Sequence, residues 1–398
     1  MSEHEHQHAE SQRPPITLVI LAVAMLIALG VIGRSNAPSI QAQTNPNEET
    51  VEARVIAVLD EGVIDQGGIQ QPYQRLRLEI LSGSRAGRAV DVDYGTQGFA
   101  SGSIIYRADD RVQVSQIIRP DGGELYFITE PDRLGALITL LLLFIVVILT
   151  VSRWKGVRSL LGMAISLYVI TQFILPLILA GRDPVLVSVL GAFGLLAATQ
   201  YLIYGWSLKT HAAVLGIFIS LVITGVLASI FVDAARLSGF GAEEVGFLQA
   251  AAGAINPRGL LLAGILIGAI GVLDDLTISQ ASAVFELSRA NRALSIRELY
   301  RRAMNIGQDH IASTVNTLVL AYVGASLPLL LLFAVYPQPF GQIVNREFVT
   351  EEVVRTLVGS LGLVSAVPIT TLLACVLVGG PKGAPVGGHA RKVDLDTH

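Results

Sequence analysis

Long uninterrupted apolar runs are the feature that most constrains this chain. A helix needs about 17 to 25 mostly apolar residues to cross the hydrocarbon core of a bilayer. About eight stretches meet this requirement, and they cover residues 16–32, 134–151, 160–180, 185–204, 213–232, 260–277, 311–335 and 357–378. Hydrophobic residues make up 52% of the 398 residues and charged residues 15%, which is too apolar for a soluble fold. The sequence therefore predicts an all-α transmembrane bundle of about eight helices.

Composition also excludes several classes of function. The net charge of -4 provides no basic field that would attract a nucleic acid. The one cysteine, Cys375, lies in an apolar run, so no disulfide can form within the chain. Zinc-protease, serine-nucleophile and phosphate-loop motifs are absent from the sequence, and the signatures of intramembrane aspartyl proteases do not fit. We therefore expect no enzyme activity, catalytic residue, metal site or cofactor.

Basic residues in short loops predict the orientation, because cytoplasmic loops are enriched in Lys and Arg. One such loop holds Arg153, Lys155 and Arg158, and another extends from Arg289 to Arg302. If these two loops are cytoplasmic and each successive span crosses the membrane in the opposite direction, both termini lie in the cytoplasm. We therefore expect a multi-pass protein of a bacterial inner membrane. The predicted domains are a tail with an N-terminal anchor helix (1–33), an extracytoplasmic domain (34–133), the bundle (134–380) and a cytoplasmic tail (381–398). A cleaved signal peptide is the alternative for the first span.

The extracytoplasmic segment differs in composition from the bundle. Five stretches in which apolar and polar residues alternate, as in strands, lie between residues 51 and 128. Turn-rich tracts such as 62–68 and 82–87 separate them. This pattern predicts a small β-rich domain of the OB-like or barrel type. A docking module or a ligand-binding module would fit the pattern, and an envelope protein is a candidate partner.

Polar residues concentrate in the sixth and seventh spans, where the bilayer makes them costly. Asp275, Ser279 and Ser282 share one helix face, and Asn305, Asp309, Ser313 and Asn316 share another. If the two helices form an antiparallel hairpin, the faces meet. We therefore predict an ion-binding site for protons or a monovalent cation, in which Asp275 and Asp309 bind the ion and the helpers are Asp274, Ser279, Ser313, Asn316 and Thr317. The alternative is a structural role, in which arginines neutralise the acids and the hydroxyls bond to helix backbones.

Several motifs together resemble the YibE/F family of bacterial multi-pass membrane proteins. They are the run from Arg153 to Leu161, the Gly181–Pro184 turn, the Asp274–Asp275 pair and the segment from Asn305 to Gly324. The resemblance covers residues 51–378 and implies a multi-pass membrane protein, but it defines no reaction.

A fainter analogy leads to the functional hypothesis. Asp274 and Asp275, followed by a basic loop and a Ser/Thr-rich helix, are similar to the proton-conducting hairpin of RND and SecDF-type transporters. The leading hypothesis is a proton- or cation-coupled transporter or export factor. The alternative is a non-transporting scaffold or sensor, and a homo-oligomer fits either hypothesis.

Overall fold

The computed structural model describes residues 48–66, 69–96, 104–119, 123–252 and 255–379, together with Val31 and Ser35. The described chain forms two compact units, of which the smaller is Ser39–Arg153 and the larger contains the segment from Trp154 onward. The predicted first span and the predicted C-terminal tail lie outside the described residues, except for Val31 in the first span.

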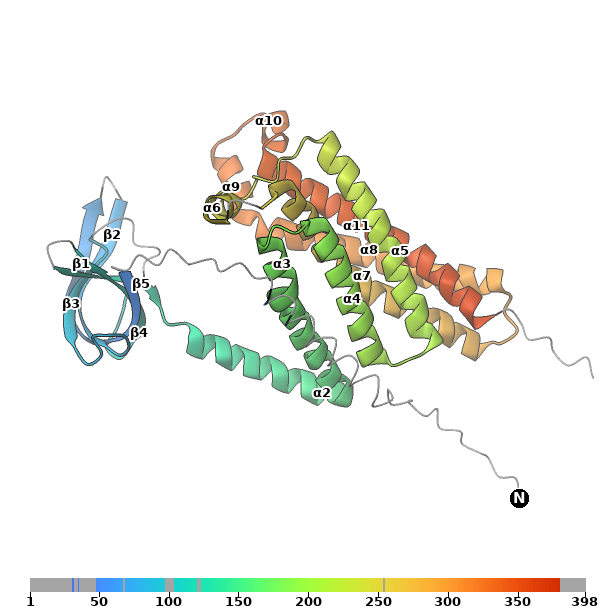
Figure 1. Ribbon diagram of the computed structural model, residues 1–398, viewed down its shortest axis with the longest axis horizontal. Helices are drawn as coiled ribbons and strands as arrows, with labels where there is room; N and C mark the ends of the chain where they lie inside the picture. The colour runs from blue at the N-terminus through green and yellow to red at the C-terminus, as the bar shows by residue number, and fades with distance from the viewer. Residues whose placement is uncertain are drawn as a thin grey trace, which may run out of the picture. The chain divides into compact units, whose positions relative to one another are not determined.

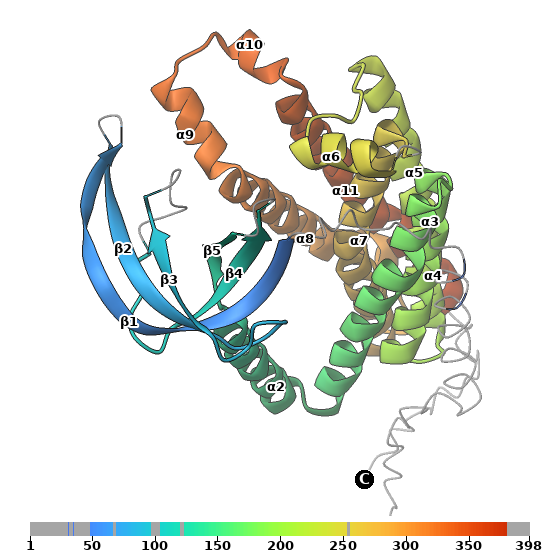
Figure 2. The same cartoon turned by 60° about the vertical axis from the view of Figure 1, so that its left-hand side comes forward.

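A five-stranded antiparallel sheet forms the core of the smaller unit (Figure 2). Its strand order is β3-β2-β1-β4-β5, and the edge strands β3 and β5 contact each other, so the sheet curls. The predicted small β domain is confirmed, whereas its OB-like class stays a prediction. The strands are β1 (Glu48–Gln66), β2 (Ile69–Ile80), β3 (Ala89–Tyr94), β4 (Arg111–Ile118) and β5 (Glu124–Pro131).

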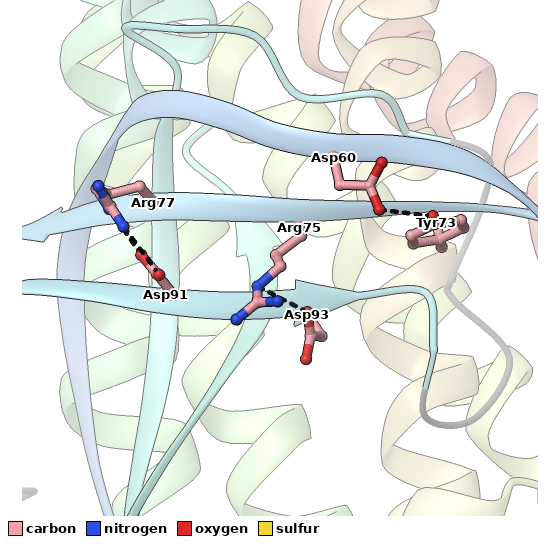
Figure 3. Close-up of polar contacts among 6 residues, drawn as sticks. All are labelled: Asp60, Tyr73, Arg75, Arg77, Asp91 and Asp93. Carbon is pink, nitrogen blue, oxygen red and sulfur yellow. Dashed lines mark hydrogen bonds and ion pairs between the residues drawn. The ribbon is translucent and has the colours of Figure 1, made fainter.

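Alternation along the strands separates an apolar core from a charged outer face. On β2, Leu76, Leu78 and Ile80 are buried, while Arg75 and Arg77, which alternate with them, are exposed. The two arginines pair with the β3 residues directly opposite them, Arg75 with Asp93 and Arg77 with Asp91 (Figure 3). This outer face is suited to water rather than to lipid. The core consists of Val51, Ala53, Val55, Leu76, Leu78, Ile80, Val92, Tyr106, Val112 and Val114.

Glu124, at the start of β5, is a second charged centre of the sheet domain. Its carboxylate accepts a hydrogen bond from the Tyr126 hydroxyl at 2.9 Å and pairs with Arg85 at 2.5 Å and Arg88 at 2.8 Å. The Tyr126 hydrogen bond and the two guanidinium groups hold the pKa of Glu124 below its usual range. The ionised form therefore ties β5 to the β2–β3 connection.

We expect Glu124→Gln to reduce the hydrogen-exchange protection of β5 amides in the full-length protein at neutral pH. A carboxylate with a lowered folded pKa stabilises the fold above its unfolded pKa of about 4.3, and this stabilisation disappears as the pH falls through the folded pKa. The difference between wild type and variant, after correction for intrinsic exchange rates, should be constant from about pH 8 to 5 and shrink below about pH 4. Glu52→Gln, at an exposed position without an ion pair among the described residues, is the control. A difference that widens on acidification would contradict this role.

Helices form the rest of the described chain. Among the residues that the structure describes, five helical segments are long and apolar enough to cross a membrane, and a sixth results if α8 and α9, which meet at a 61° bend, form one span. These helices fit a membrane protein, but the predicted count of eight is not confirmed. The helices of the described chain, whether or not they are candidate spans, are α2 (Leu134–Val169), the π-helix η1 (Ile170–Ile174), α3 (Leu175–Leu179), α4 (Pro184–Tyr204), α5 (Leu208–Ala234), α6 (Glu243–Ala252), α7 (Pro257–Ala290), α8 (Ile296–Ala325), α9 (Leu327–Val335), α10 (Phe340–Val344) and α11 (Glu347–Val378).

Two predicted spans, 134–151 and 160–180, lie in one helical segment, Leu134–Leu179, which is broken by a kink at Arg153. This segment has 46 residues, roughly 70 Å at 1.5 Å per residue, which is more than twice the hydrocarbon thickness of about 30 Å. Arg153 interrupts its helical backbone with φ 49° and ψ −128°. The segment is therefore long enough to hold two crossings that turn at Arg153.

Helices α5 and α11 lie side by side and antiparallel (Figure 1). Small residues occupy every fourth position of their contact. Gly216 on α5 abuts Thr370 on α11, and two turns further along α5, Thr224 abuts Gly362. Lipid provides no hydrophobic drive for helix association, so close van der Waals contact at small residues stabilises such a pair. The buried small residues are Ala212, Gly216, Ser220, Thr224 and Ala228 on α5 and Gly362, Ala366, Thr370 and Ala374 on α11.

The first turns of α11 hold the connection between α5 and α6. Glu347 accepts hydrogen bonds from the Ser238 amide at 2.6 Å, the Ser238 hydroxyl at 2.5 Å and the Gly239 amide at 3.0 Å. One turn later, Glu351 accepts from the Gly241 amide at 3.1 Å. Gly239 has φ +85°, and a Cβ there would overlap the Pro257 carbonyl, so a glycine is required. This loop therefore fixes the start of α11 beside the start of α7.

We expect Gly216→Ala to destabilise the protein by about 1–3 kcal/mol, because the added methyl group would overlap Thr370. Gly225→Ala on the same helix is the control, since its methyl group would lie 3.5 Å from Leu266, an ordinary contact. Thermal unfolding in detergent measures both. Adding Thr370→Ala to the Gly216 variant should recover part of the loss. Equal stability of the two glycine variants would rule out the close contact as the cause.

Candidate functional site

Helices α4 and α7 begin in the same way and at neighbouring points. Asp183 caps α4 and Asn256 caps α7, each accepting a hydrogen bond from a first-turn amide, and each is followed by a proline. The Cβ position of Gly259 lies 3.1 Å from Pro184, so the two starts are in contact. Because α4 and α7 then pack together, residues at similar distances from their caps lie at the same depth.

Gln200 and Asp274 are such a pair. The Gln200 side-chain amide donates to the Asp274 carboxylate at 2.6 Å and to the Asp274 main-chain carbonyl at 3.3 Å. Gln200 is buried and Asp274 is half-buried, and the Gln200 side-chain oxygen has no partner among the described residues. The acid of α7 is therefore held by one amide of α4.

A cavity of about 340 Å³ opens beside this pair, between α2, η1, α4 and α7. Its walls are mostly apolar, but Ser159, Ser166, Thr199 and Asp274 also line it. The hydroxyls of Ser166 and Thr199 donate to carbonyls of their own helices. Among the described residues of the lining, Asp274 thus supplies the ionisable group. An apolar cavity with a few polar groups in its wall is typical of ligand sites.

The π-helix η1 shapes one wall of the cavity. Pro176 follows it closely and has no amide hydrogen, and its ring would clash with the Gln172 carbonyl in a regular α-helix. The wider π turn relieves this clash, and the Leu175 amide instead bonds to the Ile170 carbonyl. Ile170 and Ile174 of this turn line the cavity.

The other predicted site residues lie elsewhere. Asp275 is exposed on the same face of α7 as Gly264, Gly268 and Gly271, and Ser279 is half-buried. On α8, the side chains of Asp309, Ser313, Asn316 and Thr317 are exposed, and Thr317 donates to the Ser313 carbonyl at 2.9 Å.

The packed face of α8 explains this exposure. Ile311, Val315 and Leu318 contact the core formed with α7 and α11, so Asp309 points away from it. Among the described residues, no hydrogen bond or ion pair joins Asp275 to Asp309. The paired acidic site between the sixth and seventh spans therefore stays a prediction.

Two buried glutamines were not among the predicted site residues. Gln200 is one, and Gln280 is the other, whose amide donates to the Ala303 carbonyl at 2.9 Å and to the Thr371 hydroxyl at 2.7 Å. Gln280 thereby connects α7, α8 and α11. The signal in the sequence was a lone amide within an apolar stretch, since such a group requires a partner at membrane depth.

Comparison with protein families identifies the helical part of the chain. Residues 140–380, more than half of the sequence, match the model of the YibE/F-like proteins. The chain belongs to the YibE/F family. The resemblance seen in the sequence is thus confirmed, and the Asp274 cavity of this YibE/F protein lies within the matched region. Comparisons with curated proteins and with solved structures give no match.

We expect Gln200→Leu to destabilise the YibE/F protein by about 1–3 kcal/mol, because a half-buried carboxylate loses its hydrogen-bond donor. The double variant Gln200→Leu with Asp274→Leu removes both polar partners and should recover much of this loss. Thermal unfolding in one detergent and one buffer measures the cycle. Additive losses in the double variant would show that the two residues do not interact.

Proposed function

We propose that this YibE/F protein is a proton- or cation-coupled membrane transporter or export factor, and that Asp274 binds the coupling ion. The observation that carries the proposal is the Asp274 carboxylate itself, which is half-buried, faces the cavity and is held by the Gln200 amide. In this proposal the protein is not an enzyme, and its helices cross the bacterial inner membrane several times.

The cost of charge in a membrane supports this role. An ionised aspartate near the centre of a spanning helix costs about 3 kcal/mol on insertion scales, and binding a proton or a cation neutralises it. A carboxylate has about four acceptor sites, and Gln200 occupies one of them. The remaining sites leave room for an ion that enters through the cavity.

Gln200 is suited to a group that gains and loses a proton. Its amide nitrogen donates to the ionised carboxylate. Its side-chain oxygen, which has no partner among the described residues, would accept a hydrogen bond from protonated Asp274 after rotation of the amide. Both states would therefore have a partner, which favours a proton over a metal cation.

The sheet domain supports a second candidate function, a scaffold or sensor that binds an envelope protein. Around a shallow hollow of about 560 Å³, lined in part by Val58, Leu59 and Ile105, this domain exposes large apolar side chains. Ile105, which lines the hollow, is 60% exposed. Such exposure on a domain with a charged outer face is typical of a protein-binding surface.

The test is ion flux into proteoliposomes that contain the full-length protein. We expect wild type to conduct protons under a pH gradient or a membrane potential, and Asp274→Asn to reduce the rate at least tenfold because its amide cannot exchange a proton. Asp275→Asn, at the adjacent exposed position, should retain flux if Asp274 binds the ion, and this variant distinguishes the proposal from the paired site of Asp275 and Asp309 predicted from the sequence. Thermal unfolding establishes that the variants are folded.

Undiminished flux in folded Asp274→Asn would contradict the coupling role of Asp274. Equal loss in Asp275→Asn would instead favour the paired acidic site predicted from the sequence. Absence of flux from wild type under every gradient would instead favour the scaffold or sensor.

A further inference from the structure

An apolar groove lies between two helix pairs at the end of the bundle opposite the α7–α8 loop. Its volume is about 510 Å³, and the 61° bend between α8 and α9 forms one wall, while α10 and the first turns of α11 form the other. The lining includes Tyr322, Leu330 and Phe333 on the first wall and Phe340, Phe348 and Val353 on the second. A groove of this size and composition accommodates a small apolar ligand.

An unpaired cation lies at the rim of this groove. The guanidinium of Arg346 stands 5.7 Å from the ring centroid of Phe333, which itself stacks on Phe348. The Gln338 side chain accepts a hydrogen bond from Arg346 at 2.9 Å. Arg346 is exposed and forms no ion pair among the described residues. Its guanidinium is therefore held in place with donors still free.

The neighbouring carboxylates are already engaged. Glu347 is bound by Ser238 and Gly239 of the α5–α6 connection. Glu352, which lines the groove, pairs with Arg355 at 2.9 Å. Glu347 keeps its charge, but its carboxylate is bound at the α5–α6 connection, whereas the Arg346 guanidinium lies over the Phe333 ring of the groove. The cation beside the apolar groove thus favours a ligand with an anionic head and an apolar tail.

We infer that this groove binds one acyl chain of an anionic phospholipid whose phosphate pairs with Arg346. Apart from the short α10, the walls belong to α11, which has the length and composition of a membrane span, and to the bent pair of α8 and α9, which qualifies as one span together. An acyl chain can therefore enter from the bilayer. Arginine donates two parallel hydrogen bonds to a phosphate. The site is separate from the Asp274 cavity and does not depend on transport.

The test is native mass spectrometry of the full-length protein in detergent, titrated with phosphatidylglycerol or phosphatidylcholine of identical chains. Wild type should bind the anionic lipid about fivefold to tenfold more tightly, and Arg346→Gln should abolish this preference. Arg297→Gln is the matched control, since Arg297 is an exposed arginine of α8 without an ion pair among the described residues.

A second pair of variants tests the chain-binding part of the groove. Leu330→Trp fills the groove and should weaken binding of both lipids, whereas Leu331→Trp on the same helix lies outside the lining and should bind as wild type does. Thermal unfolding establishes that both variants are folded.

Four results would overturn the inference. They are no lipid preference in wild type, an unchanged preference in Arg346→Gln, an equal loss in Arg297→Gln, and normal lipid binding by Leu330→Trp. Conversion of a dimer to a monomer by Leu330→Trp, with lipid binding intact, would assign the groove to a second copy of the chain instead.

Discussion

The close approach of α5 and α11 is the contact on which the larger unit depends. Lipid surrounds apolar helices as favourably as protein does, so helices in a membrane associate through tight packing and hydrogen bonds. Small residues recur every four positions on both helices, and Gly216 and Gly362 each receive a threonine from the other helix. Helix α7 packs against both members of the pair. Together, α5, α7 and α11 form the core against which α4 and α8 are placed.

The position of α7 gives its two adjacent acids different surroundings. Successive residues point about 100° apart on a helix. With Leu273 in the core, Asp274 faces α4 and Gln200, whereas Asp275 faces away and is exposed. A one-residue step thus separates an acid that lines a cavity from one that lies on the surface. The same reasoning explains why the polar face of α8 lies outside the core, because Ile311 and Val315 occupy the face that packs.

At the start of α11, the acidic side chains have partners within the protein, whereas the Arg346 guanidinium is available to a ligand. Glu347 and Glu351 accept amide hydrogen bonds from the α5–α6 connection, and Glu352 has its own arginine. Arg346, between these acids and α10, keeps its charge at the rim of the groove. The bend at Ser326 and Pro328 directs α9 away from α11 and thereby opens this groove, since a proline cannot continue the hydrogen-bond ladder of α8.

The amino-acid sequence by itself determined the features that depend on local periodicity. Apolar length predicted helices suited to a membrane, period-two alternation predicted the β domain, and the motifs around Asp274 and Asn305 identified the family. Asp274 was predicted only as a helper of Asp275 and Asp309. The tertiary structure alone decided its partner, because Gln200 is 74 positions away and helical periodicity shows which face a residue occupies but not which helix covers that face. For the same reason the cavity, the Gln280 network and the groove beside Arg346 became visible only once the helices were packed.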